Sequence, residues 1–144
     1  MKKKTPRQRQ IERMDKMFSE IIRRRAIMRV GGCEYSLKPK YDKEREDGTI
    51  YPAWKQLQCS HFIGRGNLHT RWDLDNAIGA NGNSHMKLEH NPPLHKNFFL
   101  KHIGTDRVER LENLSQQNGK VDLDSIENML KESLKRWRDN ERTL

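Results

Sequence analysis

The chain has 144 residues, of which 33% are hydrophobic and 34% are charged, and its formal net charge at pH 7 is +9. This length leaves room for one domain with helical extensions, and this composition requires a small core. The sequence has no long apolar run and no signal-peptide pattern, so we expect no membrane partner and a cytoplasmic location. The two cysteines, Cys33 and Cys59, are too few for a disulfide framework.

The positive charge is concentrated near the N-terminus. Residues 1–29 contain eleven Lys or Arg and three Asp or Glu, which gives +8 of the total. Apolar residues in this segment recur at helical spacing and predict a helix over 7–29 that ends at Gly31-Gly32. The apolar face consists of Ile11, Met14, Phe18, Ile21, Ile22 and Met28, and the opposite face carries Arg9, Arg13, Arg23 and Arg24. We expect these four arginines to bind nucleic-acid phosphates; the alternative is a solvated tail.

The middle of the chain is interpreted from its prolines, its glycines and its short apolar runs. The expected elements are a loop or hairpin over 33–50, a strand within 51–62 that carries His61 near its end, a turn over 79–82, a helix over 84–91 capped by Asn83 or Ser84, and a helix from Pro93 to His102. Pro92-Pro93 separates the two helices, because a residue that precedes proline avoids the helical conformation.

The C-terminal segment is predicted to be helical. Thr105 is a candidate N-cap for a helix that Asn118-Gly119 ends. Asp122 or Asp124 opens a last helix, and its apolar stripe indicates a contact with the core or with a partner helix. The stripe consists of Ile126, Met129, Leu130, Leu134 and Trp137.

His61, Asn76 and His85 form the pattern that indicates chemistry. A compact one-metal nuclease needs three groups. One activates water, a second orients the group that activates water, and a third holds a divalent cation against a phosphate. A histidine with the ordinary pKa of about 6.5 can act as a general base at neutral pH, and we assign that role to His61. His85 and Glu89 are four residues apart and share one helix face. They offer mixed nitrogen and oxygen ligands for Mg²⁺ or Mn²⁺, with Zn²⁺ as the alternative.

The stretch around these residues resembles the HNH (ββα-metal) nuclease motif. More narrowly, His-Phe-x-x-Arg at His61 followed by Thr-Arg-Trp-Asp-x-x-Asn at Thr70 is similar to the phage recombination endonucleases of the NinG/Rap family. The resemblance covers residues 54–104. It implies an α+β fold with a small ββα-metal core and flanking long α-helices. It also implies a metal-dependent DNA endonuclease that hydrolyses phosphodiester bonds in branched DNA such as Holliday junctions.

The resemblance also implies roles for single residues. Asn76 would orient His61 and tighten the loop between the strands, and His85 would be a metal ligand. Arg65 and Arg71 flank the site, where an arginine can contact a phosphate with two parallel donors.

One departure from the family pattern concerns the catalytic metal. Ser60 stands where many HNH nucleases have an Asp or His ligand just before the general base. The site must therefore rely on His85, Glu89, water and the substrate phosphate, or recruit Asp73 or Asp75.

A second departure concerns structural zinc. Relatives of this type often carry two Cys-x-x-Cys pairs, and the corresponding pairs here are Cys33-x-x-Ser36 and Asn81-x-x-Ser84. Structural zinc needs about four cysteine or histidine ligands, so we expect no structural tetrathiolate zinc. The helices over 7–29 and 122–140 are expected to replace its stabilising role.

The expected organisation is a basic N-terminal helix over 1–30, an HNH nuclease core over 31–104 and C-terminal helices over 105–144 that pack on the core. His90 and His95 are expected at the surface or against phosphate. Junction resolution needs two matched cuts, which favours a homodimer. The alternatives are a nicking or homing-type HNH nuclease on duplex DNA, and a DNA-binding protein whose nuclease site has decayed.

Overall fold

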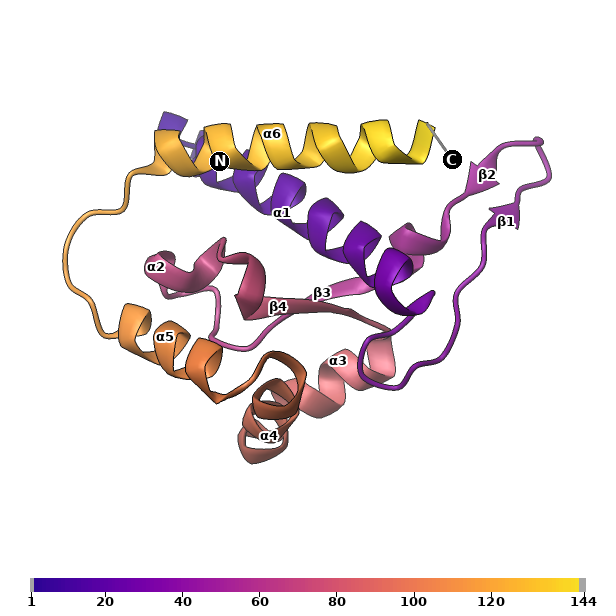
Figure 1. The fold of residues 1–144 in the computed structure, drawn as a ribbon. Helices are drawn as coiled ribbons and strands as arrows, with labels where there is room; N and C mark the ends of the chain where they lie inside the picture. The colour runs from indigo at the N-terminus through magenta and orange to yellow at the C-terminus, as the bar shows by residue number, and fades with distance from the viewer. Residues whose placement is uncertain (1, 143–144) are drawn as a thin grey trace.

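Residues 2–142, which the computed structural model describes, form helices around short antiparallel hairpins, and this confirms the expected α+β class (Figure 1). The helices are α1 (Pro6–Val30), α2 (Leu68–Arg71), α3 (Gly82–Glu89), α4 (Pro92–Ile103), α5 (Thr105–Ser115) and α6 (Leu123–Arg142). The strands are β1 (Lys43–Glu44), β2 (Ile50–Tyr51), β3 (Gln58–His61) and β4 (Ala77–Ala80). The 3₁₀ turns η1 (Ala53–Gln56) and η2 (Leu74–Asn76) precede β3 and β4.

Helix α1 begins and ends within one residue of the positions that the sequence predicts. At its start, the Thr5 hydroxyl accepts a hydrogen bond from the Gln8 N–H at 3.1 Å, and the Gln8 side chain accepts one from the Thr5 N–H at 2.8 Å. These reciprocal bonds satisfy two N–H groups that a helix start leaves without a partner. At the other end Gly31 has a φ of 69°, a conformation that glycine adopts without strain.

Helix α1 lies between α6 and the β3–β4 hairpin and contacts both (Figure 1). It links two clusters of buried side chains. One cluster joins Met14, Phe18, Ile21 and Ile22 to Leu123, Leu130 and Leu134 of α6, and the other joins Ala26 to Ile78, Leu88 and Phe99. The helix is therefore a central part of the core and not a basic arm beside it, because apolar side chains cover two of its sides.

The β3–β4 hairpin and α3 form a continuous β–β–α unit. The two strands pair in antiparallel fashion, and His61 lies opposite Ala77. Helix α3 begins after Asn81, whose side chain accepts a hydrogen bond from the Ser84 N–H at 2.9 Å. Asn81 is thus the N-cap, in place of the expected Asn83 or Ser84. The strand that carries His61 is shorter than predicted, because η1 occupies the first part of the segment.

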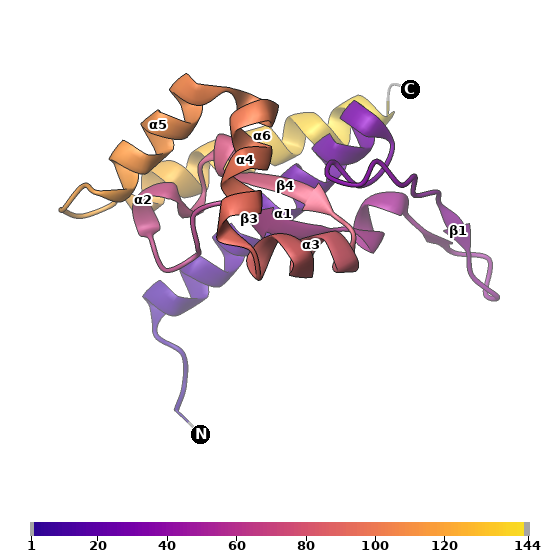
Figure 2. The ribbon, with the colours of Figure 1, turned by 90° about the horizontal axis from the view of Figure 1, so that it is seen from below.

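The predicted loop or hairpin over 33–50 contains β1, which pairs with β2 so that Lys43 lies opposite Tyr51. This hairpin projects from the rest of the molecule (Figure 2). Its strand residues are exposed or only half-buried, so it contributes little to the core.

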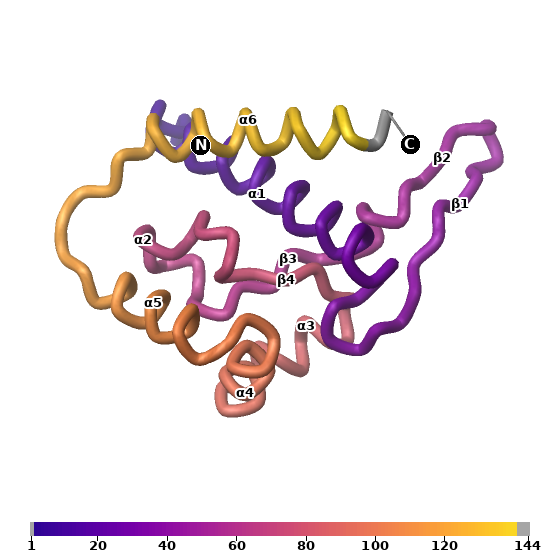
Figure 3. Tube along the Cα trace, viewed as in Figure 1, coloured from indigo at the N-terminus to yellow at the C-terminus, as the bar shows by residue number. Residues whose placement is uncertain are grey.

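The C-terminal helices return the chain to α1. Helix α5 begins at Thr105 after Gly104, and it ends earlier than the predicted Asn118-Gly119. The connection over 116–122 then leads to α6 beside α1 (Figure 3). The Asp122 carboxylate accepts a hydrogen bond from the Ser125 N–H at 3.1 Å, which confirms an aspartate at the start of the last helix. Within residues 2–142, no helix has both the length and the apolar character that a membrane span requires.

Candidate active site

His61 lies at the end of β3 with its ring held on two sides. The ring centroid is 5.3 Å from that of Phe18 in α1, and Nε2 is 3.0 Å from the carbonyl oxygen of Arg71. Since a carbonyl only accepts hydrogen bonds, Nε2 carries the proton and Nδ1 keeps its lone pair. Burial lowers the pKa of His61 below its usual value, and the hydrogen bond to Arg71 opposes this only in part. His61 is therefore neutral at pH 7.

Asn76 is fully buried and fixes the loop that connects β3 to β4. Its amide nitrogen donates to the carbonyls of Ile63 at 2.9 Å and Thr70 at 3.0 Å, and its amide oxygen accepts from the Ile63 N–H at 2.8 Å. The loop is the segment that presents the Arg71 carbonyl to His61. The contacts of Asn76 thus orient His61 through the loop backbone.

His85 and Glu89 lie together on α3, as their spacing predicts. Nε2 of His85 is 3.3 Å from a carboxylate oxygen of Glu89. Nδ1 of His85 is buried and has no hydrogen-bond partner among the described residues. The pair thus offers imidazole and carboxylate donors to a cation. No three His, Cys, Asp or Glu side chains within residues 2–142 are grouped so that they could hold a metal ion.

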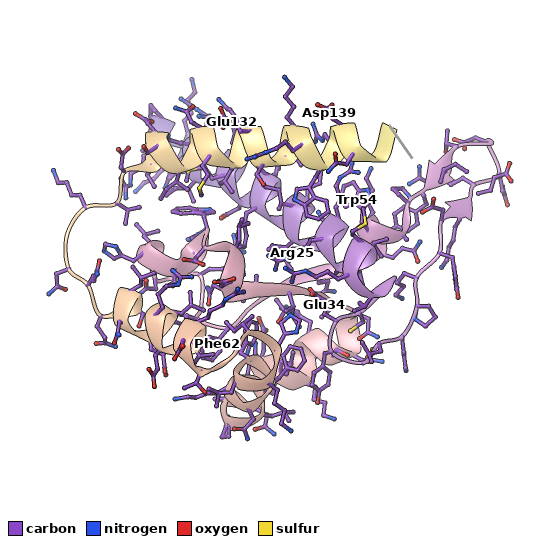
Figure 4. The ribbon with its side chains drawn as sticks, viewed as in Figure 1. Arg25, Glu34, Trp54, Phe62, Glu132 and Asp139 are labelled. Atoms are coloured by element: carbon purple, nitrogen blue, oxygen red, sulfur yellow. The ribbon has the colours of Figure 1, made fainter. Side chains whose placement is uncertain are left out.

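His95 was expected at the surface or against phosphate, and the surface position is wrong. The residue is 6% exposed, and in residues 2–142 its Nε2 has no hydrogen-bond partner. Its ring contacts Phe62 at 5.8 Å and Phe99 at 5.4 Å between centroids. Figure 4 shows Phe62 beside α4, from which His95 extends. Sequence spacing contained the signal, because His95 is four residues before Phe99 and therefore shares the buried face of the helix.

His61 lines two hollows of the surface. The smaller one, of about 360 Å³, lies between the end of β3 and helices α3 and α4. Its lining is His61, Phe62, Gly64, Leu88, Glu89, Pro92 and His95. The larger one, of about 600 Å³, lies between α1 and β3, and its charged lining residues are Asp15, Lys16, Glu20, Arg23 and Arg65. The smaller hollow brings the candidate base and the candidate metal ligand Glu89 to one space.

Ser60, which precedes the candidate base, and the possible substitute ligands Asp73 and Asp75 lie in different surroundings. Ser60 is fully buried, and its hydroxyl has no hydrogen-bond partner within the described chain. Asp73 receives two hydrogen bonds of 2.8 Å from Arg110, and Asp75 receives one of 3.0 Å from the same guanidinium. These ion pairs hold both carboxylates toward α5.

The arginines predicted to bind DNA from α1 do not share one exposed face. Arg9 is exposed at the start of the helix. Arg13 pairs with Glu127 of α6 at 3.1 Å. Arg23 and Arg24 lie over the ring of Trp54, at 4.8 and 4.6 Å from its centroid. Arg24 is also paired with Glu20 at 2.9 Å and only 11% exposed. The four arginines do not form the single exposed face that was expected, because α1 is central and neighbouring elements lie against most of its surface.

Arg65 and Arg71, the other predicted DNA contacts, both form ion pairs with Asp15 of α1. Arg65 is 59% exposed and remains open to a second partner, whereas Arg71 is 17% exposed. A third hollow of about 580 Å³ adjoins this ion pair and is lined by Lys2, Lys3, Lys4, Thr5, Gln8, Ile11, Glu12, Asp15, Arg65 and Arg71. Basic side chains therefore lead from the N-terminal lysines to the hollows at His61.

The four positions that correspond to the Cys-x-x-Cys pairs lie together. The Ser36 N–H donates to Sγ of Cys33 at 3.3 Å, and the Asn81 side chain donates to the Ser36 hydroxyl at 3.2 Å. Burial acts to raise the pKa of the Cys33 thiol, but hydrogen bonds from Ser36, Ser84 and the Asn81 backbone outweigh it and lower this pKa. Hydrogen bonds thus connect the two loops at these positions.

Comparison of the chain with family models, with curated proteins and with solved structures found no match.

Proposed function

We propose that the protein is a metal-dependent DNA endonuclease of the HNH type, which hydrolyses phosphodiester bonds. One observation carries this proposal. One β–β–α unit carries all three residues of the pattern: His61 lies at the end of the first strand, Asn76 directly before the second strand, and His85 on the helix. In addition, His61 and Glu89 line the same hollow of about 360 Å³.

His61 serves as the general base. Its Nε2 proton is held by the Arg71 carbonyl at 3.0 Å, so Nδ1 accepts the proton of the attacking water. The lowered pKa of His61 keeps the ring neutral, and thus able to accept a proton, at pH 7. A general base of this kind typically contributes about 10²–10⁴-fold to the rate.

His85 and Glu89 are the residues that would hold the cation. Nε2 of His85 lies 3.3 Å from a carboxylate oxygen of Glu89, so these two donors can face one divalent ion that keeps positions for water and phosphate. A bound Mg²⁺, Mn²⁺ or Zn²⁺ would stabilise the charge that develops on the phosphate oxygens. Two protein ligands are also compatible with the absence of a three-residue cluster among residues 2–142.

The proposed substrate is DNA because basic residues adjoin the hollows at His61. Lys16 and Arg65 line the larger of these hollows. Lys2, Lys3 and Lys4 line the third hollow, which shares Asp15 and Arg65 with it, and these basic side chains carry the charge that phosphates require. Branched DNA is the substrate class that the NinG/Rap resemblance suggests, and two matched cuts in a junction would favour a symmetric homodimer.

A DNA-binding protein with a decayed nuclease site is the second candidate. The buried position of Ser60 supports it, since no ligand precedes the base in the place that many HNH nucleases use.

Cleavage assays separate these candidates. The protein is incubated with supercoiled plasmid and with a four-way junction, in Mg²⁺ or Mn²⁺, with EDTA as a control and with His61→Ala as the matched variant. We expect metal-dependent cleavage that His61→Ala reduces by at least about tenfold, while DNA affinity stays nearly unchanged. Preference for the junction supports branched DNA as the substrate, and plasmid nicking alone supports the duplex alternative. Binding without cleavage in either metal would favour the decayed site.

A further inference from the structure

Asp15 lies on α1, outside the stretch that resembles the HNH motif, and faces the loop between β3 and β4. Its carboxylate accepts four hydrogen bonds from that loop. Oδ1 accepts from Nε of Arg71 and from Nε1 of Trp72, both at 3.0 Å. Oδ2 accepts from Nη2 of Arg71 at 2.6 Å and from Nη2 of Arg65 at 2.7 Å. A carboxylate has about four lone-pair positions, so these four hydrogen bonds occupy all the acceptor positions of Asp15.

These bonds fix Arg71 in particular. Arg71 presents two donors to Asp15, the paired arrangement that defines both the distance and the plane of a guanidinium. A third donor of the same side chain bonds the Arg65 carbonyl at 2.9 Å. Burial acts against ionisation of Asp15, but hydrogen bonds and charges from Arg71 and Arg65 outweigh it and lower the pKa of Asp15. The carboxylate is therefore charged at neutral pH.

The main chain of the same arginine contacts the candidate base. The Arg71 carbonyl lies 3.0 Å from Nε2 of His61. A displacement of Arg71 would therefore remove the bond that keeps the proton on Nε2. The indole of Trp72, the next residue, is held by the same carboxylate, so Asp15 restrains the backbone on both sides of this carbonyl.

We propose that Asp15 is a positioning residue of the active site: it fixes the Arg71 carbonyl and thereby sets the tautomer of His61. This inference rests on the proposed role of His61 as general base. It makes α1 part of the catalytic apparatus as well as part of the core.

A purely structural ion pair is the competing explanation, and the charges around His61 allow a test. The charged residues that line its larger hollow or act on its pKa are Asp15, Lys16, Glu20, Arg23, Arg65 and Arg71. The Arg71 hydrogen bond and the Asp15 charge both raise the pKa of His61. Loss of Asp15 should therefore lower that pKa through the loss of its charge alone, so the tautomer of His61 is the measurement that separates positioning from a purely structural ion pair.

The experiment compares wild type, Asp15→Asn, Asp15→Glu and a control, Glu132→Gln. Glu132 is an exposed acid on α6 and lines none of the hollows described above. The tautomer of His61 is measured by ¹⁵N NMR on the metal-free protein, and the pH profile of cleavage is measured alongside.

We expect wild type and Glu132→Gln to show one tautomer with the proton on Nε2, and Asp15→Asn to show a mixture. In Asp15→Asn, kcat should fall by about tenfold to a hundredfold, and the acidic limb of the profile should move to lower pH. Asp15→Glu should restore part of both. An unchanged tautomer in folded Asp15→Asn would overturn the proposal.

If Asp15→Asn does not fold, Arg71→Gln provides the second test, because it keeps the carbonyl and removes the guanidinium. A single Nε2–H tautomer in that variant would also overturn the proposal. The NMR measurement does not need cleavage. A wild type that cuts no DNA would contradict the proposed nuclease, while the tautomer would still decide the role of Asp15.

Discussion

A β-carbon added to Gly79 would lie 2.6 Å from the β-carbon of Ala26, so β4 crosses α1 at the closest distance that these two residues allow. Gly79 is also bonded on its other side, where its N–H donates to the Glu34 carboxylate at 2.8 Å and its carbonyl accepts from the Glu34 N–H at 2.9 Å. The sequence suggested a turn at Gly79. The structure shows instead that Gly79 lies within strand β4. Helix α1 occupies the space that a side chain at this position would need.

The first prediction concerns this crossing. Gly79→Ala should lower the free energy of unfolding by about 1–3 kcal/mol, because the added methyl group forces β4 away from α1. Urea unfolding measures the change. Gly66→Ala is the matched control, since a β-carbon there meets nothing within 4 Å. Equal losses in the two variants would contradict the close approach.

The second prediction concerns pH and His95. Burial lowers the pKa of His95; the charge of Glu89 opposes this shift and that of His85 adds to it. An unfolded histidine binds a proton at about pH 6.5, so below this pH the unfolded chain holds more protons than the folded one. Stability should therefore fall as pH falls, with a slope of at most about 1.4 kcal/mol per pH unit for this one group.

His95→Phe removes the titrating group and keeps a ring in the aromatic cluster, so it should flatten the decline between about pH 7 and 5. The free energy of unfolding in urea is measured at several pH values in this range. His90→Gln, at an exposed histidine, should keep the wild-type slope. If His95→Phe also keeps it, His95 does not titrate abnormally.

Local signals in the sequence were sufficient for the long helices. Apolar spacing that ends at Gly31 predicted α1, and Pro92-Pro93 separated α3 from α4. These signals act over a few residues, where backbone hydrogen bonding and steric exclusion decide the outcome. The short helix α2 was not predicted. The α+β class was expected from the resemblance to the HNH motif.

The position of α1 in the core could not be predicted in this way. Arg25 illustrates the reason: it is 8% exposed and donates to the carbonyls of Leu74 and Ala77, both at 2.8 Å. Those carbonyls are 49 and 52 positions away in sequence, so local patterns do not indicate these bonds. Asp15 was missed for the same reason, since its partners lie fifty or more positions along the chain.

The third prediction concerns the metal ligands. His85→Ala should raise the Mg²⁺ or Mn²⁺ concentration that gives half-maximal cleavage, and Glu89→Ala should raise it more mildly, because each removes one donor from the pair on α3. The measurement is a cleavage titration against each metal. His90→Ala, which alters an exposed histidine next to Glu89, is the control. If Glu89→Ala gives the wild-type titration, Glu89 is a surface acid and not a ligand.

The fourth prediction concerns the hydrogen-bonded cluster at Cys33. The protein as purified should contain no stoichiometric tetrathiolate zinc, since one thiol is present where about four ligands are needed. The variant Ser36→Cys, Asn81→Cys, Ser84→Cys should bind one Zn²⁺ per chain, because these side chains already connect the two loops. Metal analysis and thermal unfolding with and without chelator measure both. Zinc bound by wild type, or none bound by the triple variant, would contradict this reading of the cluster.

The last prediction locates the DNA contact. Arg13 and Arg24 are poor probes because each is paired with a glutamate that is at most 13% exposed. Lys2, Lys3 and Lys4 are exposed beside Arg65, and Glu12, which pairs with Lys4, is exposed as well. Each phosphate that a lysine neutralises on duplex DNA contributes about −0.9 to the slope of log K against log salt. Changing the three lysines to Gln should therefore reduce the slope by about one to three units.

Fluorescence anisotropy at several salt concentrations measures this slope. The control changes three exposed lysines on or before α6, Lys120, Lys131 and Lys135, to Gln. It removes the same charge from around α6, outside the hollows that the N-terminal lysines and His61 line, and should leave the slope nearly unchanged. If both variants reduce the slope equally, DNA responds to the net charge of the protein and not to a path along the N-terminal lysines. If neither does, the N-terminal lysines do not contact phosphate.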